Sequence, residues 1–226
     1  MTWCVYAVTG AAAGPIRVRG FRGEALTLIR VAGLGAVVGP AGRAPKPTAA
    51  NLSAYHDSLQ RLSSSLPSVL PVRYGTLMSD EEIAFVLRAR RQSLRRALRL
   101  VKGRLQMTVR LIETGDGAHV SSEAVERDGA AGAGSGTAFL MARASTAARA
   151  RAVPAFDGLR PAVRRWVRAE RVERRKGVVS IYHLVPRGSA AAYQRALRAA
   201  ATAAGTAVQI SGPFPAYAFA SDIGDA

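Results

Sequence analysis

Largely apolar runs separated by glycines predict three strands near the start of the chain. The runs cover residues 3–8, 25–31 and 36–38. The first run contains no polar residue, which is typical of a strand covered on both faces, whereas the other two form a hairpin around turn glycines. A helix over 48–65 with one apolar face follows, and a short strand is expected over 69–74.

Residues 79–102 predict a long helix with two different stripes along it. Ser79 and Glu82 have the spacing of a capping box at its start, and Gly103 is expected to end it. One stripe is apolar and consists of Ile83, Leu87, Leu94, Leu98 and Val101. The other lies about a quarter-turn round the helix, is basic, and consists of Arg88, Arg91, Arg95, Arg99 and Lys102. The pattern indicates a helix that buries its apolar stripe and exposes its basic one.

The second half of the chain predicts another sheet with helices. Polar and apolar residues alternate over 104–112, as in a half-buried strand, and the Gly- and Ala-rich segment 115–136 is expected to be a flexible loop. The elements predicted after it are helices over 137–151 and 159–169, strands over 171–175 and 178–185, a helix from Ser189 to about Ala203, and a strand over 206–210. This βαββαβ order is that of ferredoxin-like domains.

Together these elements predict an α+β protein of two small α/β domains. We place the boundary near Gly103, with an N-terminal domain over 1–103 and a C-terminal ferredoxin-like domain over 104–226. The N-terminal domain is expected to be a related mixed sheet with helices on one face. Roughly a hundred residues on each side of the boundary are enough for two small hydrophobic cores.

The chain is strongly basic, since its 226 residues include 32 Lys and Arg against 15 Asp and Glu, a net charge of +17. A charge of this size favours acidic partners, whether a nucleic acid, an anionic membrane or an acidic protein surface. Nearly all of it comes from arginine, and an Arg-, Ala- and Gly-rich composition also follows from genomic base composition. The net charge alone therefore does not select a partner.

Cysteine usage and the apolar segments are typical of a cytoplasmic protein. Cys4 is the single cysteine, so no intrachain disulfide can form, which fits a reducing compartment. No secretory signal is recognisable at the N-terminus. The uncharged stretch 199–221 is interrupted by glycines and prolines, so we expect no membrane-spanning helix.

Side chains that could carry catalysis or bind a metal are scattered along the sequence. His56, His119 and His183 lie in different predicted elements, and none has a Cys or Glu at metal-ligand spacing. The glycine-rich segment 132–137 lacks the lysine of a phosphate-binding loop, and the acidic residues 80–82 suit a helix N-terminus. We therefore expect no catalytic site, no metal and no cofactor, and a protein that is not an enzyme.

The basic stripe is the strongest candidate for an interaction surface. It would dock an acidic partner, although a solvated helix face accounts for the same pattern. A second basic cluster lies between Arg164 and Lys176, and nucleic acid is a natural partner on charge alone. The predicted strands lack the spaced exposed aromatics of an RNA-recognition module, so nucleic acid is not the partner we expect.

Two segments resemble the signature segments of the GvpL/GvpF family of gas vesicle proteins. Residues 70–76 (LPVRYGT) stand before the long helix, and residues 212–219 (GPFPAYAF) stand at the end of the chain. Shorter matches in the same order are residues 33–38, His56, residues 136–140 and residues 180–185. The chain departs from the family pattern at Phe214, where Trp is commoner, at Ala216, where a second Pro is usual, and at Gln106 or Met107, where Glu is usual.

The resemblance implies a two-domain α/β protein that is not an enzyme. It implies a cytoplasmic and gas vesicle location, binding to the small hydrophobic gas vesicle shell protein, and help in nucleating or assembling the vesicle wall. We place the candidate protein-binding residues in the segment 70–76 and on the basic stripe: Arg73, Tyr74, Arg88, Arg91, Arg95, Arg99 and Lys102. The alternative is a basic nucleic-acid-binding module.

Overall fold

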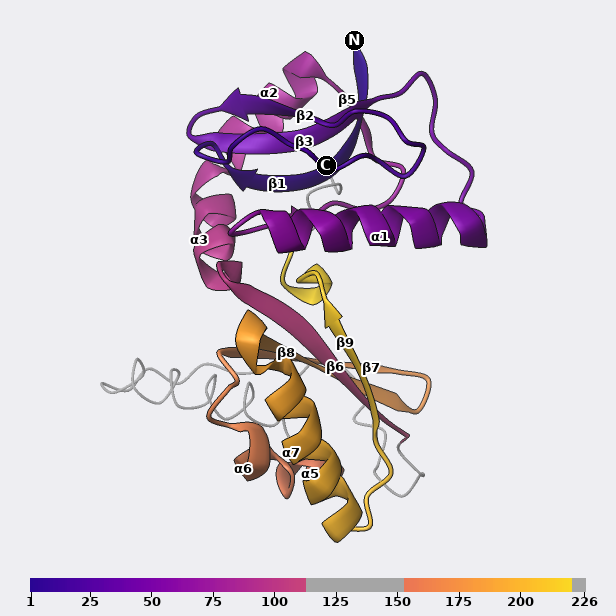
Figure 1. Cartoon of the computed structure of the whole chain (residues 1–226), viewed down its shortest axis with the longest axis vertical. Coiled ribbons are helices and arrows are strands. Elements are labelled where there is room, and N and C mark those ends of the chain that lie inside the picture. The colour runs from indigo at the N-terminus through magenta and orange to yellow at the C-terminus, as the bar shows by residue number, and fades with distance from the viewer. Residues whose placement is uncertain (113–152, 221–226) are drawn as a thin grey trace, which may run out of the picture.

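The computed structural model describes residues 1–112 and 153–220, which form two antiparallel sheets, one in each half of the chain (Figure 1). The first sheet has the strand order β2-β3-β1-β4, with β5 also paired to β1. Its strands are β1 (Thr2–Gly10), β2 (Thr27–Val31), β3 (Leu34–Pro40), β4 (Leu70–Pro71) and β5 (Leu77–Ser79). The second sheet has the order β7-β8-β6-β9. Its strands are β6 (Arg104–Ile112), β7 (Ala169–Arg175), β8 (Val178–Pro186) and β9 (Gln209–Phe214). The predicted α+β class is confirmed.

The central strand β1 is buried on both faces, as its apolar sequence predicts. A bulge between Val5 and Ala7 shifts its register against β3. Val5 and Val8 therefore face one layer of the core, whereas Cys4, Tyr6 and Ala7 face the other. Because neither side of this strand is polar, each face of the sheet needs an apolar cover.

Helices provide that cover on both faces of the first sheet (Figure 1). α1 (Ala49–Ser65) packs Tyr55 and Leu59 on one face. α2 (Asp80–Ala89) and α3 (Arg91–Val101) pack the predicted apolar stripe on the other face. The expectation of a mixed sheet with helices on one face is wrong in both respects, because its strand pairs are antiparallel and β1 requires cover on both sides.

The single helix predicted over 79–102 is two helices, because the chain turns at Arg90. The capping box at its start is confirmed, since the Ser79 hydroxyl accepts from the Glu82 amide at 3.2 Å and the Glu82 carboxylate accepts from the Ser79 amide at 2.7 Å. The five residues of the apolar stripe are all buried. No glycine or proline marks the turn, so the apolar periodicity does not reveal it.

Short helices and one long helix cover one face of the second sheet. These are α5 (Pro154–Asp157), α6 (Arg160–Val163) and α7 (Ala190–Ala203), which pack against apolar side chains of β6 and β8. The strand order is compatible with the predicted βαββαβ arrangement. However, the predicted helix 137–151 and loop 115–136 lie outside the described residues, so the ferredoxin-like assignment stays a prediction.

Several element boundaries differ from the sequence prediction. The helix expected over 159–169 is reduced to the single turn α6, and β7 already begins at Ala169. The last strand is β9, at 209–214 rather than 206–210. The strand expected over 69–74 is limited to the two residues of β4, and β5 was not predicted. Pairing with β1 decides both of these short strands, and the local pattern does not show such pairing.

The two halves of the chain share a hydrophobic core. The cluster under α2 and α3 includes Leu184 of β8 together with Ala216 and Phe219 of the C-terminal segment, where the short helix η2 (Tyr217–Phe219) lies. The chain passes from the first sheet to the second at Gly103, and β6 begins at the next residue. The division into domains 1–103 and 104–226 stays a prediction, because this core crosses the boundary.

Arg187 connects the second half to the end of α1. Its guanidinium donates to the carbonyl oxygens of Leu66 at 2.7 Å and of Ser64 at 3.4 Å. The last turn of α1 has no basic residue of its own. Arg187, in the short helix η1 (Arg187–Ser189), therefore supplies the positive charge that stabilises the negative end of α1.

The shared core predicts different costs for truncating two phenylalanines. Phe219→Ala removes a side chain that is 2% exposed, and we expect it to lower the free energy of unfolding by about 3–5 kcal/mol. The matched control Phe85→Ala removes a side chain that is 69% exposed, and we expect a change within about 0.5 kcal/mol. Urea unfolding of both variants measures this difference. Similarly small losses of unfolding free energy for the two variants would contradict the shared core.

Candidate functional site

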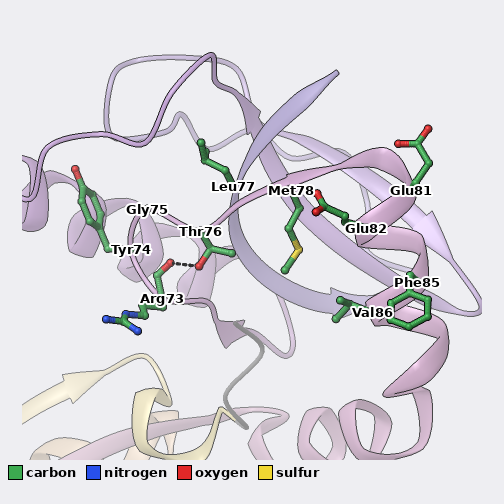
Figure 2. A pocket seen from close by; sticks show the side chains of 10 residues that line it. All are labelled: Arg73, Tyr74, Gly75, Thr76, Leu77, Met78, Glu81, Glu82, Phe85 and Val86. Carbon is green, nitrogen blue, oxygen red and sulfur yellow. Dashed lines mark hydrogen bonds between the residues drawn. The ribbon is translucent and has the colours of Figure 1, made fainter. Parts of the chain in front are cut away.

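An open pocket of about 790 Å³ lies between α2 and the chain that follows β4 (Figure 2). It is lined by Arg73, Tyr74, Gly75, Thr76, Leu77, Met78, Glu81, Glu82, Phe85 and Val86. We call this pocket the α2 groove. It contains two of the seven predicted binding residues, Arg73 and Tyr74. The Phe85 side chain in its lining is one of the few exposed large apolar side chains of the described residues.

The segment 70–76 forms one wall of the α2 groove as a turn between β4 and β5. Gly75 has a φ of 80°, a conformation that residues with a side chain rarely adopt. The Thr76 hydroxyl donates to the Arg73 carbonyl at 2.9 Å, and the Val5 amide donates to the Thr76 carbonyl at 2.9 Å. These bonds attach the turn to β1 and leave the Arg73 side chain exposed.

Tyr74 is held by the protein itself. Its hydroxyl donates to the Lys46 carbonyl at 3.0 Å. Its ring packs edge-on against Phe21 and Tyr55, with ring centroids 5.6 Å and 5.1 Å away. Of the two predicted residues in this segment, only Arg73 therefore has a side chain that is available to a partner.

The α2 groove carries opposite charges at its two ends (Figure 2). Arg73 lies at the end next to β4 and Glu81 at the end formed by the first turn of α2, with Met78 between them. The Glu82 carboxylate is already engaged in the capping box. Within the described part of the chain, neither the Arg73 guanidinium nor the Glu81 carboxylate has a hydrogen bond or an ion pair. Both charges therefore remain available.

The predicted basic stripe is divided at the turn between α2 and α3. A hollow of about 610 Å³ at this turn is lined by Arg88, Arg91 and Arg96, together with Gln92 and Ser93. Arg96 was missed in the sequence, because in one continuous helix it points away from the stripe. The turn at Arg90 brings Arg96 into the same hollow as Arg88, and the sequence contains no signal for this turn.

Arg91 and Arg95 hold the hairpin turn between β2 and β3. The Arg91 Nε donates to the Ala32 carbonyl at 3.1 Å, and the Arg95 guanidinium donates to the same oxygen at 3.4 Å. Arg95 also covers Gly33, where a Cβ atom would lie 2.2 Å from the Arg95 Nη2 atom. Four further basic side chains of these two helices are exposed, and we call them the arginine surface: Arg88, Arg96, Arg99 and Lys102.

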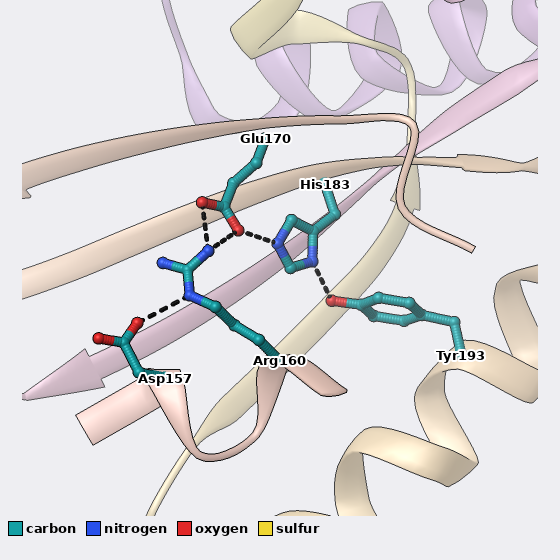
Figure 3. A network of polar contacts seen from close by, with 5 residues as sticks. All are labelled: Asp157, Arg160, Glu170, His183 and Tyr193. Atoms are coloured by element: carbon teal, nitrogen blue, oxygen red, sulfur yellow. Dashed lines mark hydrogen bonds and ion pairs between the residues drawn. The ribbon is translucent and has the colours of Figure 1, made fainter. Parts of the chain in front are cut away.

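A polar network lies between the second sheet and its helices (Figure 3). The Arg160 guanidinium contacts the Asp157 carboxylate at 2.8 Å and the Glu170 carboxylate at 2.5 Å. His183, which is 1% exposed, contacts Glu170 through Nε2 at 2.7 Å and the Tyr193 hydroxyl through Nδ1 at 2.6 Å. The five residues come from α5, α6, β7, β8 and α7, so the network joins the helical layer to the sheet.

Charge pairing decides the protonation state of Glu170. Burial alone would raise its pKa, but the hydrogen bonds from His183 and Arg160 outweigh burial and lower the pKa from 4.5 to about 2. The ionised carboxylate can only accept, so His183 Nε2 donates to it, and the hydrogen bond between Nδ1 and the Tyr193 hydroxyl holds the other side of the ring. Each ring nitrogen of His183 thus has a partner, which is the pattern of a structural histidine.

Other reactive groups are likewise enclosed by the fold. Burial and the nearby Glu24 raise the pKa of the Cys4 thiol to about 11, so the thiol stays protonated. Among residues 1–112 and 153–220, no group of three or more His, Cys, Asp or Glu side chains could hold a metal ion. The same residues contain no helix that is long and apolar enough to cross a membrane. His119 lies outside the described residues.

The Glu170 network predicts a specific pH dependence of stability. Because the pKa of Glu170 is lower in the folded state, its stabilisation is complete above about pH 4.5 and is lost as the pH falls toward 2. We expect Glu170→Gln to lower the free energy of unfolding by roughly 2 kcal/mol at pH 7 and by much less at pH 2.5. Urea unfolding at the two pH values measures this, with Glu173→Gln on the same strand as the control. A loss that is equal at both pH values would contradict the pairing.

Comparison with known proteins now identifies the family. Residues 2–221 match the family model described as "Gas vesicle synthesis protein GvpL/GvpF". No curated protein matches the chain by sequence. The fold is similar to the crystal structures of the gas vesicle protein GvpF from Anabaena sp. PCC7120 and from Microcystis aeruginosa.

The TM-scores are 0.67 for the Anabaena protein and 0.70 for the Microcystis protein, each at 10% sequence identity. The alignments cover 97% of this chain and 98% and 99% of those chains. At this identity the crystal structures show a common fold, whereas the family model matches nearly the whole sequence. The chain therefore belongs to the GvpL/GvpF family of gas vesicle synthesis proteins.

Proposed function

We propose that this protein assists assembly of the gas vesicle wall by binding the gas vesicle shell protein, and that the arginine surface is the docking site. Membership of a gas vesicle synthesis family supports the role in gas vesicle formation. Binding to the shell protein is the expectation that the family resemblance carries. The observation that supports the location is the unopposed positive charge of residues 88–102, from the end of α2 to the end of α3.

Residues 88–102 include seven basic residues and no acidic one. Arg88, Arg96, Arg99 and Lys102 are exposed, and the described part of the chain provides no carboxylate paired with any of the four. Crowding like charges on one surface costs free energy, and an acidic partner removes this cost. Charge-assisted hydrogen bonds from arginine to carboxylate are also stronger than neutral ones.

A basic docking surface suits the problem that a hydrophobic shell subunit poses. Such a subunit aggregates unless its apolar surface is covered before it assembles. Complementary charges speed its encounter with the accessory protein and set its orientation, while apolar contacts at the same interface cover the subunit. The accessory protein itself acts here by binding, without catalysis.

A charge-reversal variant tests the location. The triple variant Arg88→Glu, Arg96→Glu and Arg99→Glu leaves Arg91 and Arg95 in place, because these hold the Ala32 turn. We expect it to retain at least about tenfold less shell protein in a pull-down at low salt. The control Arg164→Glu, Arg195→Glu and Arg198→Glu makes the same change in net charge at exposed positions of the second half and should retain the shell protein.

Two outcomes would count against this proposal. Equal retention by both triple variants would refute the location on α2 and α3, though not the family assignment. Normal vesicles in a strain that lacks this protein and any second family member would refute an assembly role. The nucleic-acid alternative stays a separate prediction, and a mobility shift of DNA or RNA that weakens with salt tests it.

A further inference from the structure

The α2 groove has polar and apolar parts, and the described part of the chain provides no cover for the apolar part. Phe85 is 69% exposed, and the half-buried Leu77 and Met78 continue the apolar surface into the groove. An aromatic ring left in water loses the stabilisation that burial of its large apolar area provides. The groove therefore has the chemistry of a contact surface, and its occupant must have an apolar centre.

The charges of the groove restrict the occupant further. Arg73 and Glu81 stand at opposite ends with Met78 between them, and Phe85 stands on the α2 side (Figure 2). A partner that fits must present a negative group opposite Arg73 and a positive group opposite Glu81. A second copy of the groove carries both of these groups, a carboxylate at one end and a guanidinium at the other.

We infer that the α2 groove is a self-association surface, in which a second copy of this chain binds around a two-fold axis. In a two-fold interface the same patch meets itself, so the patch must be complementary to itself. Rotation about an axis through the middle of the groove places Arg73 of each copy opposite Glu81 of the other. It also brings the Phe85 ring of each copy, which stands on the α2 side of the groove, over the opposite wall of the facing groove near Leu77, which removes the ring from water.

Net charge supports this surface over others. Two copies that each carry +17 repel one another wherever basic faces meet. The α2 groove is lined by one guanidinium and two carboxylates, a net charge of −1 per copy, so two facing grooves repel one another much less than two basic faces do. The arginine surface is unsuited to self-contact for the same reason. The groove and the arginine surface can therefore bind different partners, and this inference does not depend on the proposed function.

The size of the groove sets the expected strength of the dimer. Ten residues on each side are fewer than the roughly 20–30 of a standard specific interface, so we expect association to be weak and reversible. We expect a dissociation constant on the order of 10–100 μM, and moderate salt should favour the dimer slightly by screening the overall repulsion.

Sedimentation velocity of the full chain tests the inference, over about 5–500 μM protein in 0.15 M NaCl. We expect the wild type to shift from monomer to dimer across this range and Phe85→Ser to remain a monomer. Arg73→Glu and Glu81→Arg should each raise the dissociation constant about tenfold, and the double variant should restore it, because the swapped charges again face one another. Circular dichroism and thermal unfolding confirm that each variant is folded.

Matched controls separate this inference from the proposed function. Arg88→Glu lies outside the groove and should leave the dimer intact, while Phe85→Ser should still retain shell protein. A wild type that stays monomeric at the highest concentration overturns the inference. So does a dimer that none of the groove variants weakens, or a double variant that fails to recover. If Phe85→Ser instead abolishes shell-protein retention by a monomeric wild type, the groove belongs to the shell protein.

Discussion

The burial of β1 on both faces is the constraint on which the rest of the structure depends. An apolar strand at the centre of an antiparallel sheet needs cover on each side, so α1 packs on one face and α2 and α3 on the other. The apolar stripe of α2 and α3 is used for this cover, and their basic residues are consequently turned outward. Pairing of β5 with the start of β1 also brings the turn at 73–76 beside α2 and so forms the α2 groove.

Polar groups are treated differently inside the protein and on its surface. Inside, Glu170, His183 and Arg160 satisfy one another, and Arg187 is placed on the carbonyl end of α1. On the surface, no carboxylate in the described part of the chain is paired with Arg88, Arg99 or Lys102. The first group stabilises the fold, whereas the second leaves charge uncompensated. Because of this contrast, we interpret the network in the second half as structural and the basic surface of α2 and α3 as a place where a partner can bind.

The two candidate surfaces have different chemistry, although both involve α2. The arginine surface is purely basic and suits an acidic partner. The α2 groove combines apolar side chains with an available charge of each sign at its ends and suits a partner of the same pattern. Under the two proposals, one copy binds a shell subunit while it associates with another copy of itself, so that several subunits are gathered at one place.

Local sequence patterns determined a substantial part of this protein. Apolar runs located β1 and α1, the Ser79–Glu82 spacing identified a capping box, and the apolar stripe 83–101 was found buried. The segments 70–76 and 212–219 identified the family. Tertiary structure alone decided the break at Arg90, the use of Arg91 and Arg95 on the Ala32 turn, and the placing of Arg73 across a groove from Glu81. Periodicity records which side of an element faces the core, because that depends on neighbours a few residues away. It does not record which distant element packs there, because that depends on contacts formed only when the sheet and its two helical layers assemble.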